Sequence, residues 1–307
     1  MIVVLTGGTG GAKLLEGLAA VTDPAELTIV CNTGDDSVFH GLYVAPDIDT
    51  ITYSLAGLSD SDKGWGIKDD TFVVLEQLRR LGEEVWFNLG DRDLATHILR
   101  TRLLRQGRKL SEVTDQIRRS LNVRSTILPM SDERVETRIR TADGDISFQE
   151  YFVKQRWAPD VLGVHFAGAE NSRPATGILD SFHRADAIIV APSNPVTSIG
   201  PILAIPEIRR ALQHSDAPVL AVSPLIGTAA ISGPADKLMI ACGRPPSVLG
   251  VAACYADFLD TIVVANEDRN MASAIEELGI RVVPAEIRMP SPEMKKNLAQ
   301  TVLNSLR

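Results

Sequence analysis

The chain has 307 residues, 45% of them hydrophobic, so it can bury a full core and intrinsic disorder is excluded. Its net charge of −8 argues against general binding to nucleic acid. No apolar run approaches the roughly 18 residues of a membrane helix, and the three scattered cysteines fit neither a metal site nor a disulfide framework. We therefore expect a cytoplasmic protein that has no membrane segment and binds no nucleic acid.

A glycine-rich turn near the start of the chain is the first functional signal. Residues 2–5 form a β-branched, apolar run typical of a buried strand, and residues 12–21 carry leucine and valine at helical spacing. The turn between them leaves backbone N–H groups at the positive end of the helix, which suits a phosphate. The candidate phosphate- and nucleotide-binding residues of this turn are Gly7, Gly8, Thr9, Gly10, Gly11 and Lys13.

Two common nucleotide-binding motifs do not fit this turn. In the G-x-G-x-x-G register Lys13 occupies the third glycine position, and no acidic residue ends the second predicted strand, residues 27–31. The P-loop motif also fails, because Lys13 is followed by Leu14. The alternative is a turn that only closes the strand against the helix, although four glycines in five residues exceed what a tight turn needs.

Acidic residues gather beyond the second predicted strand. Asp35 and Asp36 follow this strand closely, and Asp47 and Asp49 lie at the start of the next predicted helix. Carboxylate oxygens are ligands that Mg²⁺ prefers, and a cation beside a phosphate is usual in phosphoryl chemistry. We expect Asp35, Asp36 and Asp47 to hold Mg²⁺; the alternative for each is local capping and turn formation.

The middle of the chain is basic. Residues 92–140 contain 12 Lys and Arg against 6 Asp and Glu. Helical spacing covers residues 94–121, and residues 135–140 and 146–153 predict a hairpin. Arg92 lies between two acids at a helix start, where a cation needs an anion or a carboxylate as partner. Solvated helix faces are the alternative, so this charge alone is weak support for an anionic ligand.

The order of predicted elements indicates an α/β fold. Further strands are predicted at residues 84–89, 161–166, 187–191, 217–222, 261–265 and 281–283, with helices between them. We predict one domain over residues 1–307, a doubly wound, mostly parallel Rossmann-like sheet with a helical and hairpin insertion at about residues 92–157. Ligands of such sheets bind beyond the carboxyl ends of strands. Ser193 and Asn194, which follow one of these strands, are a second candidate phosphate cradle.

Six ordered blocks of the sequence resemble the 2-phospho-L-lactate transferase family, which is called CofD in archaea and FbiA in actinobacteria. The blocks are GGTGGAKLL at residues 7–15, PDIDT at 46–50, LGDRDLATH at 89–97, LPMSD at 128–132, APSNPVTSIGP at 191–201 and SGPADKLM at 232–239. The resemblance spans nearly the whole chain, and this family assembles the deazaflavin coenzyme F420.

The resemblance implies transfer of a phospho-acid unit from a GDP-activated donor, such as lactyl-2-diphospho-5′-guanosine, to the terminal hydroxyl of the deazaflavin Fo. The products would be GMP and F420-0 or its dehydro form, Mg²⁺ would assist, and the protein would be a homodimer. The resemblance also implies that Asp49 and Arg92 contact Fo. Asp49 would orient the hydroxyl or accept its proton, with Asp47 as the next candidate. Chemistry suggests Asp236 and Lys237 for guanine, since a carboxylate accepts its N–H groups.

The sequence leaves the identity of the donor acid open, because phospholactate, phosphoenolpyruvate and 3-phosphoglycerate differ only by small groups beside the same carboxylate and phosphate. It also leaves two alternatives to the transferase function. A second candidate is a regulator that resembles the YvcK-type gluconeogenesis factors, which share the glycine turn and bind UDP-sugars; the match at residues 89–93 is closer to the transferases. A third, an NAD(P)-linked oxidoreductase, rests on fold analogy and fails at Lys13.

Overall fold

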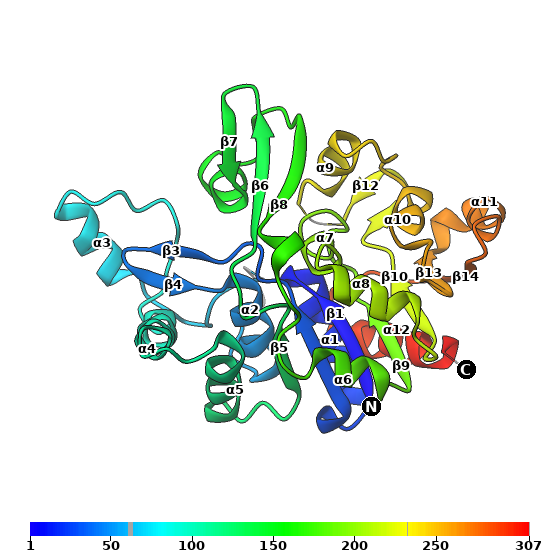
Figure 1. Ribbon diagram of the computed structural model, residues 1–307, viewed down its shortest axis with the longest axis horizontal. Helices are drawn as coiled ribbons and strands as arrows, with labels where there is room; N and C mark the ends of the chain where they lie inside the picture. Colours follow the sequence, from blue (N-terminus) through cyan, green and yellow to red (C-terminus); the bar gives the residue numbers. More distant parts are fainter. Residues whose placement is uncertain (61–63, 232, 307) are drawn as a thin grey trace.

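The centre of the molecule is one parallel sheet. The computed structural model describes residues 1–60, 64–231 and 233–306. Within them, a seven-stranded sheet has the order β14-β13-β10-β9-β1-β2-β5 (Figure 1). Its strands are β1 (Ile2–Thr6), β2 (Leu27–Cys31), β5 (Thr126–Pro129), β9 (Ala187–Val190), β10 (Val219–Val222), β13 (Thr261–Ala265) and β14 (Arg281–Ala285), and every neighbouring pair is parallel. The predicted Rossmann-like α/β fold is confirmed.

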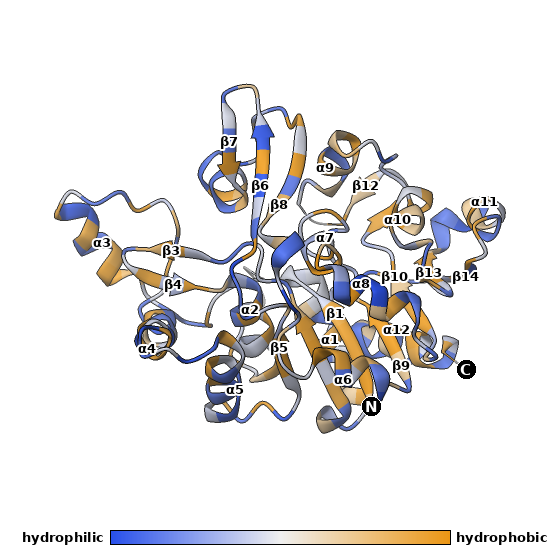
Figure 2. Cartoon of the chain, in the orientation of Figure 1, coloured by the Kyte–Doolittle hydropathy of each residue, from blue (hydrophilic) through white to orange (hydrophobic). Residues whose placement is uncertain are grey.

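Both faces of this sheet are buried, as parallel strands between helices require. The strands are rich in β-branched residues, and successive side chains point to opposite faces. In β1, Val3 and Leu5 pack into one hydrophobic core and Val4 into the other, and all three are fully buried. Figure 2 shows β1 and β9 in the orange of the hydrophobic end of the scale. Such continuous apolar runs therefore form the interior layer of the fold.

Helices cover the two faces of the sheet. One core contains α1 (Gly8–Val21), α2 (Pro46–Leu55) and α12 (Pro292–Ser305). The other contains α6 (Ile178–His183), α7 (Gly200–Leu203), α8 (Pro206–Gln213), α9 (Ala235–Ala241), α10 (Val248–Tyr255) and α11 (Ala272–Glu276). This is the doubly wound arrangement. No helix of the described residues is long and apolar enough to cross a membrane.

The order of the strands reverses between β1 and β9. The chain runs outward from β1 through β2 to β5 on one side, and from β9 through β10 and β13 to β14 on the other. Loops that follow β1 and β9 therefore leave the sheet in opposite directions and open a crevice between them. The glycine turn follows β1, and residues 191–199 follow β9.

The segment between β2 and β5, residues 32–125, is called the β2–β5 excursion here. It contains α2, the antiparallel pair β3 (Ser37–Phe39) and β4 (Leu42–Val44), α3 (Val73–Arg80), α4 (Asp93–Arg105) and α5 (Leu110–Ser120). Figure 1 shows β3, β4 and α3 projecting from the sheet. The strand predicted at residues 84–89 is wrong. Val85 and Phe87 pack onto a small core around Leu75, but β3 and β4 pair only with each other, so this stretch stays irregular.

The predicted insertion at residues 92–157 is corrected by the structure, because β5 lies inside that range and belongs to the central sheet. The predicted hairpin exists as β6 (Glu136–Thr141) and β7 (Gly144–Ser147), but Glu150–Lys154 forms a π-helix instead of more strand. A further predicted strand, β8 (Gly163–Ala167), pairs with β6 outside the central sheet. Apolar spacing predicts a strand but does not identify its partner. The remaining elements are β11 (Leu225–Ile226), β12 (Ala229–Ala230) and the short 3-10 helices Pro24–Glu26, Ala169–Asn171 and Asn266–Met271.

Candidate active site

A cavity of about 470 Å³ opens at the crevice between the loops after β1 and β9. The structure brings most of the predicted site residues to its wall. These are Gly7, Gly8, Thr9, Gly10, Lys13, Asp35, Asp47, Asp49, Ser193 and Asn194. They come from segments that lie far apart in the sequence and meet at the end of the sheet, which is where ligands of this kind of fold bind.

The glycine turn combines close packing with an open side. Gly8 has a φ of +66°, and a Cβ atom there would meet only the Asp47 carboxylate, at 4.0 Å. A Cβ atom on Gly10 would lie 2.3 Å from the main-chain oxygen of Pro192, which follows β9. Gly10 therefore lets the two loops touch, while Gly8 leaves room at the N-terminus of α1 for a ligand.

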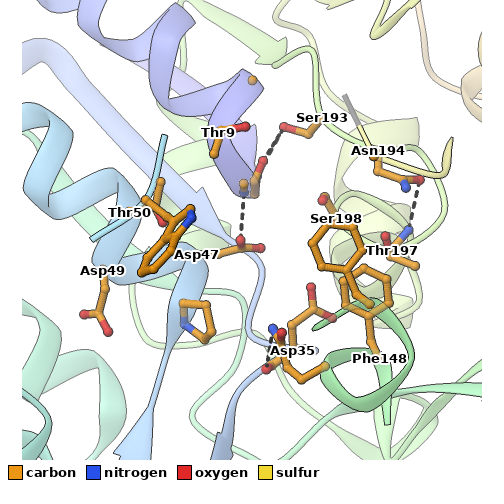
Figure 3. Close-up of a pocket in the computed structure, with 18 of the residues that line it drawn as sticks. Thr9, Asp35, Asp47, Asp49, Thr50, Phe148, Ser193, Asn194, Thr197 and Ser198 are labelled. Carbon is orange, nitrogen blue, oxygen red and sulfur yellow. Dashed lines mark hydrogen bonds between the residues drawn. The ribbon is translucent and has the colours of Figure 1, made fainter. Parts of the chain in front are cut away.

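The loop after β9 is fastened to the glycine turn. The hydroxyl of Ser193 donates to the carbonyl of Gly7 at 2.8 Å. Asn194 closes its own loop, because its Oδ1 accepts hydrogen bonds from the N–H groups of Val196 at 2.9 Å and Thr197 at 3.3 Å (Figure 3). Asn194 therefore caps a turn, and the next helix, α7, begins only at Gly200.

Two carboxylates share one amide beside the glycine turn. Asn32 donates from Nδ2 to Asp47 Oδ2 at 2.8 Å and to Asp35 Oδ2 at 3.2 Å. Asp47 also accepts the N–H of Gly8 at 2.8 Å, so it points towards the start of α1 (Figure 3). Burial raises the pKa of Asp47 to about 6, against the hydrogen bonds from Asn32 and Gly8. Burial also raises the pKa of Asp35, and the charge of Asp47 adds to it.

This donor set fits a divalent cation. Both carboxylates are buried and share the Asn32 amide, and because burial disfavours their charged forms, a nearby cation would stabilise those forms. Mg²⁺ takes oxygen ligands and would supply that positive charge. Asp36, the third predicted ligand, does not line the cavity in the described structure and accepts a hydrogen bond from Tyr43 at 3.0 Å. Asp35 and Asp47 are thus the two carboxylates of the predicted set that share the cavity.

Asp49 points away from Asp47 and towards α4 (Figure 3). Its carboxylate accepts from both terminal nitrogens of Arg100, a fully buried arginine. Sequence reasoning missed Arg100. The signal that could have found it is the spacing of Asp93, His97 and Arg100, which lie three and four residues apart on one face of a helix. One further carboxylate, one histidine and one arginine therefore belong to the site region.

Several predicted residues lie elsewhere. Arg92 is exposed, and its guanidinium donates to the carbonyl of Lys68 at 3.1 Å. Lys237 donates from Nζ to the carbonyls of Trp157 at 3.2 Å and Pro159 at 2.5 Å. Within the described ranges, the cavity wall includes neither of them, nor Asp236, nor Gly11, where a Cβ atom would collide with a β1 side chain.

Aromatic side chains complete the wall, and sequence reasoning did not select them. Trp65 and Phe87 lie on the wall that the β2–β5 excursion provides, and Phe148 and Phe152 lie on the wall near the π-helix. Phe148 and Phe152 stack with ring centroids 5.3 Å apart. The cavity therefore combines a phosphate-sized polar end with faces suited to planar rings.

The fold and this site define an α/β protein that can hold a phosphorylated, ring-bearing ligand at the switch point of its sheet. The particular family follows from sequence comparison. The model of the family described as 2-phospho-L-lactate transferase CofD matches residues 2–300, and the chain belongs to this family. Its relatives are named as transferases, and the chain is accordingly a transferase.

Individual relatives match over their full length. The chain is 43% identical over 302 residues to the 2-phospho-L-lactate transferase of Methanosarcina acetivorans, covering 98% of each chain. It is 41% identical over 309 residues to the phosphoenolpyruvate transferase of Kitasatospora aureofaciens, covering 98% of this chain and 96% of that one. A crystal structure of a UPF0052 family protein from Bacillus halodurans has a TM-score of 0.65 at 17% identity, covers 98% of both chains and supports the fold alone.

Proposed function

We propose that this transferase moves a phospho-acid unit from a guanylated donor of the lactyl-2-diphospho-5′-guanosine type to the deazaflavin Fo. The terminal ribityl hydroxyl of Fo attacks the phosphorus of the phospho-acid, the bond from that phosphorus to the GMP oxygen breaks, and GMP leaves while the hydroxyl proton is lost. The observation that carries the proposal is the full-length identity of 43% to a 2-phospho-L-lactate transferase.

The cavity supports this chemistry from the donor side. The N–H groups at the start of α1 and the ammonium of Lys13 can bind the diphosphate. Asp35 and Asp47 would hold Mg²⁺ beside the turn, and the ion would neutralise charge on the transferring phosphate. Because such transition states are loose, orientation and charge neutralisation contribute more than proton removal.

The acceptor side is the wall between α2 and α4. There Asp49 is the carboxylate proposed to contact the acceptor hydroxyl, and Trp65 and Phe87 offer apolar faces for its ring system. Arg92 lies outside this wall as described, so the positive charge closest to Asp49 is that of Arg100. In this assignment donor and acceptor occupy different walls of one cavity.

Product analysis tests the proposal and the choice of donor. Purified protein is mixed with Fo, Mg²⁺ and each of three guanylated acids, carrying phospholactate, phosphoenolpyruvate or 3-phosphoglycerate, and products are measured by mass spectrometry. Relatives named for phospholactate and for phosphoenolpyruvate are equally similar to this chain, so identity does not choose between them. A protein that binds UDP-sugars and forms no product from any donor would support the regulator instead.

Lys13→Gln is expected to weaken donor binding without weakening the fold. Lys13 is exposed at the cavity wall on α1, so its ammonium can reach a phosphate while its removal leaves the core intact. A hydrogen bond to a charged group contributes about 1.5–3 kcal/mol, which predicts a loss of GDP affinity of roughly 10- to 100-fold. Calorimetry measures it, and Lys296→Gln, an exposed lysine on α12, is the matched control. Equal GDP affinity in the two variants would place the diphosphate elsewhere.

Mg²⁺ is expected to stabilise the protein more as the pH rises. The folded-state pKa of Asp47, about 6, exceeds the unfolded value of roughly 3.9, so its contribution to stability is complete below about pH 4 and is lost as the pH rises through 6. Mg²⁺ favours the ionised form and offsets that loss. Thermal melting should therefore show a larger Mg²⁺-dependent rise in Tm at pH 7.5 than at pH 5. Asp47→Asn should abolish the rise in Tm. Asp180→Asn, at an exposed position of α6, should keep it.

A further inference from the structure

A cluster of buried polar side chains joins α2 to α4 behind one wall of the cavity. Asp49 and Tyr53 lie one turn apart on α2, and Asp93, His97 and Arg100 lie along one face of α4. All five are buried, Arg100 completely. Its guanidinium donates from Nη1 to Asp49 Oδ2 at 3.0 Å and from Nη2 to Asp49 Oδ1. Burial opposes the charge of Arg100, but the Asp49 carboxylate outweighs it and raises the pKa of the guanidinium.

The other side of this guanidinium is held by His97. Arg100 Nη1 lies 3.3 Å from His97 Nδ1, and a guanidinium can only donate, so Nδ1 accepts this hydrogen bond and the ring hydrogen is placed on Nε2. That atom lies 3.2 Å from Asp93 Oδ1, which also accepts the hydroxyl of Tyr53 at 2.6 Å. Tyr53 lies on α2, so its hydrogen bond to Asp93 also joins the two helices. The Asp49–Arg100 and Tyr53–Asp93 contacts therefore link α2 to α4 at two points.

Arg100 lies behind the cavity wall and not in it. Asp49, Tyr53, Asp93 and His97 line the cavity, whereas Arg100 does not in the part of the chain that the structure describes. Arg100 can therefore influence a bound substrate only through these neighbours. Ligand atoms of Asp49, Asp93 and His97 lie within 4.8 Å of one another, but the guanidinium already provides the positive charge that a metal ion would bring. The positive charge at the centre of this cluster is therefore the guanidinium of Arg100.

We propose that Arg100 is a positioning residue for the acceptor: it holds the Asp49 carboxylate in one orientation at the cavity wall, and His97 Nδ1 accepts a hydrogen bond from the same guanidinium. The inference rests on the proposed function, in which Asp49 contacts the acceptor while the diphosphate of the donor binds at the glycine turn. An arginine that acts through Asp49 affects acceptor binding and leaves donor binding unchanged.

Arg100→Lys tests this role because it keeps the charge and removes the two-pronged contact. We expect the KM for Fo to rise about 10-fold, as for the loss of one charge-assisted hydrogen bond, with the KM for the donor unchanged. Arg102→Lys makes the same chemical change at an exposed position of α4 and should change neither constant. Unchanged constants in Arg100→Lys, or an equal rise of both, would show that Arg100 only supports the fold.

A double-mutant cycle with Asp49→Asn gives the second readout. If Arg100 acts through Asp49, the double variant has the same KM for Fo as Asp49→Asn alone, whereas additive effects contradict the proposal. If Arg100→Lys does not fold, Asp49→Asn can be combined with Arg100→Gln, which removes both charges. This double variant is also expected to have the same KM for Fo as Asp49→Asn alone. A wild-type protein that forms no product from Fo contradicts the proposed function. An active wild type together with unchanged KM values in Arg100→Lys contradicts this inference alone.

Discussion

Asp47→Asn is expected to lower turnover by about 10²-fold, because the loss of a metal ligand removes part of the transition-state charge stabilisation of several kcal/mol that a metal ion supplies, while the folded protein becomes no less stable. The carboxylate is buried, faces the start of α1 and has a raised pKa, so its charge is unfavourable in the ligand-free protein. Asparagine keeps the shape and removes the charge that would hold Mg²⁺. Steady-state turnover with saturating Fo and donor, together with thermal melting, measures both quantities.

Asp49→Asn provides the contrast for this prediction. Asp49 is the partner of the buried Arg100, so the loss of its charge leaves the guanidinium without a counterion and should lower Tm. A lower Tm in Asp49→Asn and an equal or higher Tm in Asp47→Asn would separate the two aspartates by role. Normal turnover of Asp47→Asn at saturating substrates and Mg²⁺ would remove Asp47 from the chemistry.

Gly10→Val is expected to destabilise the protein and to eliminate donor binding together. A Cβ atom at this position would lie 2.3 Å from the main-chain oxygen of Pro192, so the loops after β1 and β9 would have to separate. Overpacking of this kind costs about 1–3 kcal/mol of unfolding free energy, or more when the obstacle is backbone. Urea denaturation measures the loss, and calorimetry with GDP measures binding.

Gly163→Val is the control for Gly10→Val. Gly163 lies in β8, has an ordinary φ, and a Cβ atom there meets nothing within 4 Å, so valine should be tolerated. If both variants unfold at the same urea concentration, the close approach at Gly10 does not limit stability. If Gly10→Val is destabilised but binds GDP like the wild type, the phosphate cradle lies elsewhere.

The cavity wall around the glycine turn could be predicted from the sequence because it depends on local signals. Apolar β-branched runs predicted the central strands, and the change from strand to helical spacing around four glycines located the turn. The parallel sheet then brings the ends of β1 and β9 together as a matter of topology. Gly8, Asp47 and Ser193 thus reach one cavity although none is near another in the chain.

The wall formed by α2 and α4 was less predictable because it depends on contacts between elements. Arg100 pairs with a residue 51 positions away, and the contact exists only because α2 packs beside α4. Arg92 has a stronger local signal, between two acids, yet it sits at the exposed start of α4. Strand partners depend on the same kind of long-range geometry. This is why β8 was expected in the central sheet and residues 84–89 were expected to form a strand.

The β2–β5 excursion has a consequence for how such a chain can diverge. It supplies one wall of the cavity, including Trp65 and Phe87, yet its 94 residues, 32–125, leave and re-enter the sheet at neighbouring strands. Changes of length or composition there leave every strand pairing of the central sheet intact. Evolution can therefore exchange this aromatic wall as a module while the glycine turn and the β9 loop, whose close contact tolerates no added side chain at Gly10, stay constant.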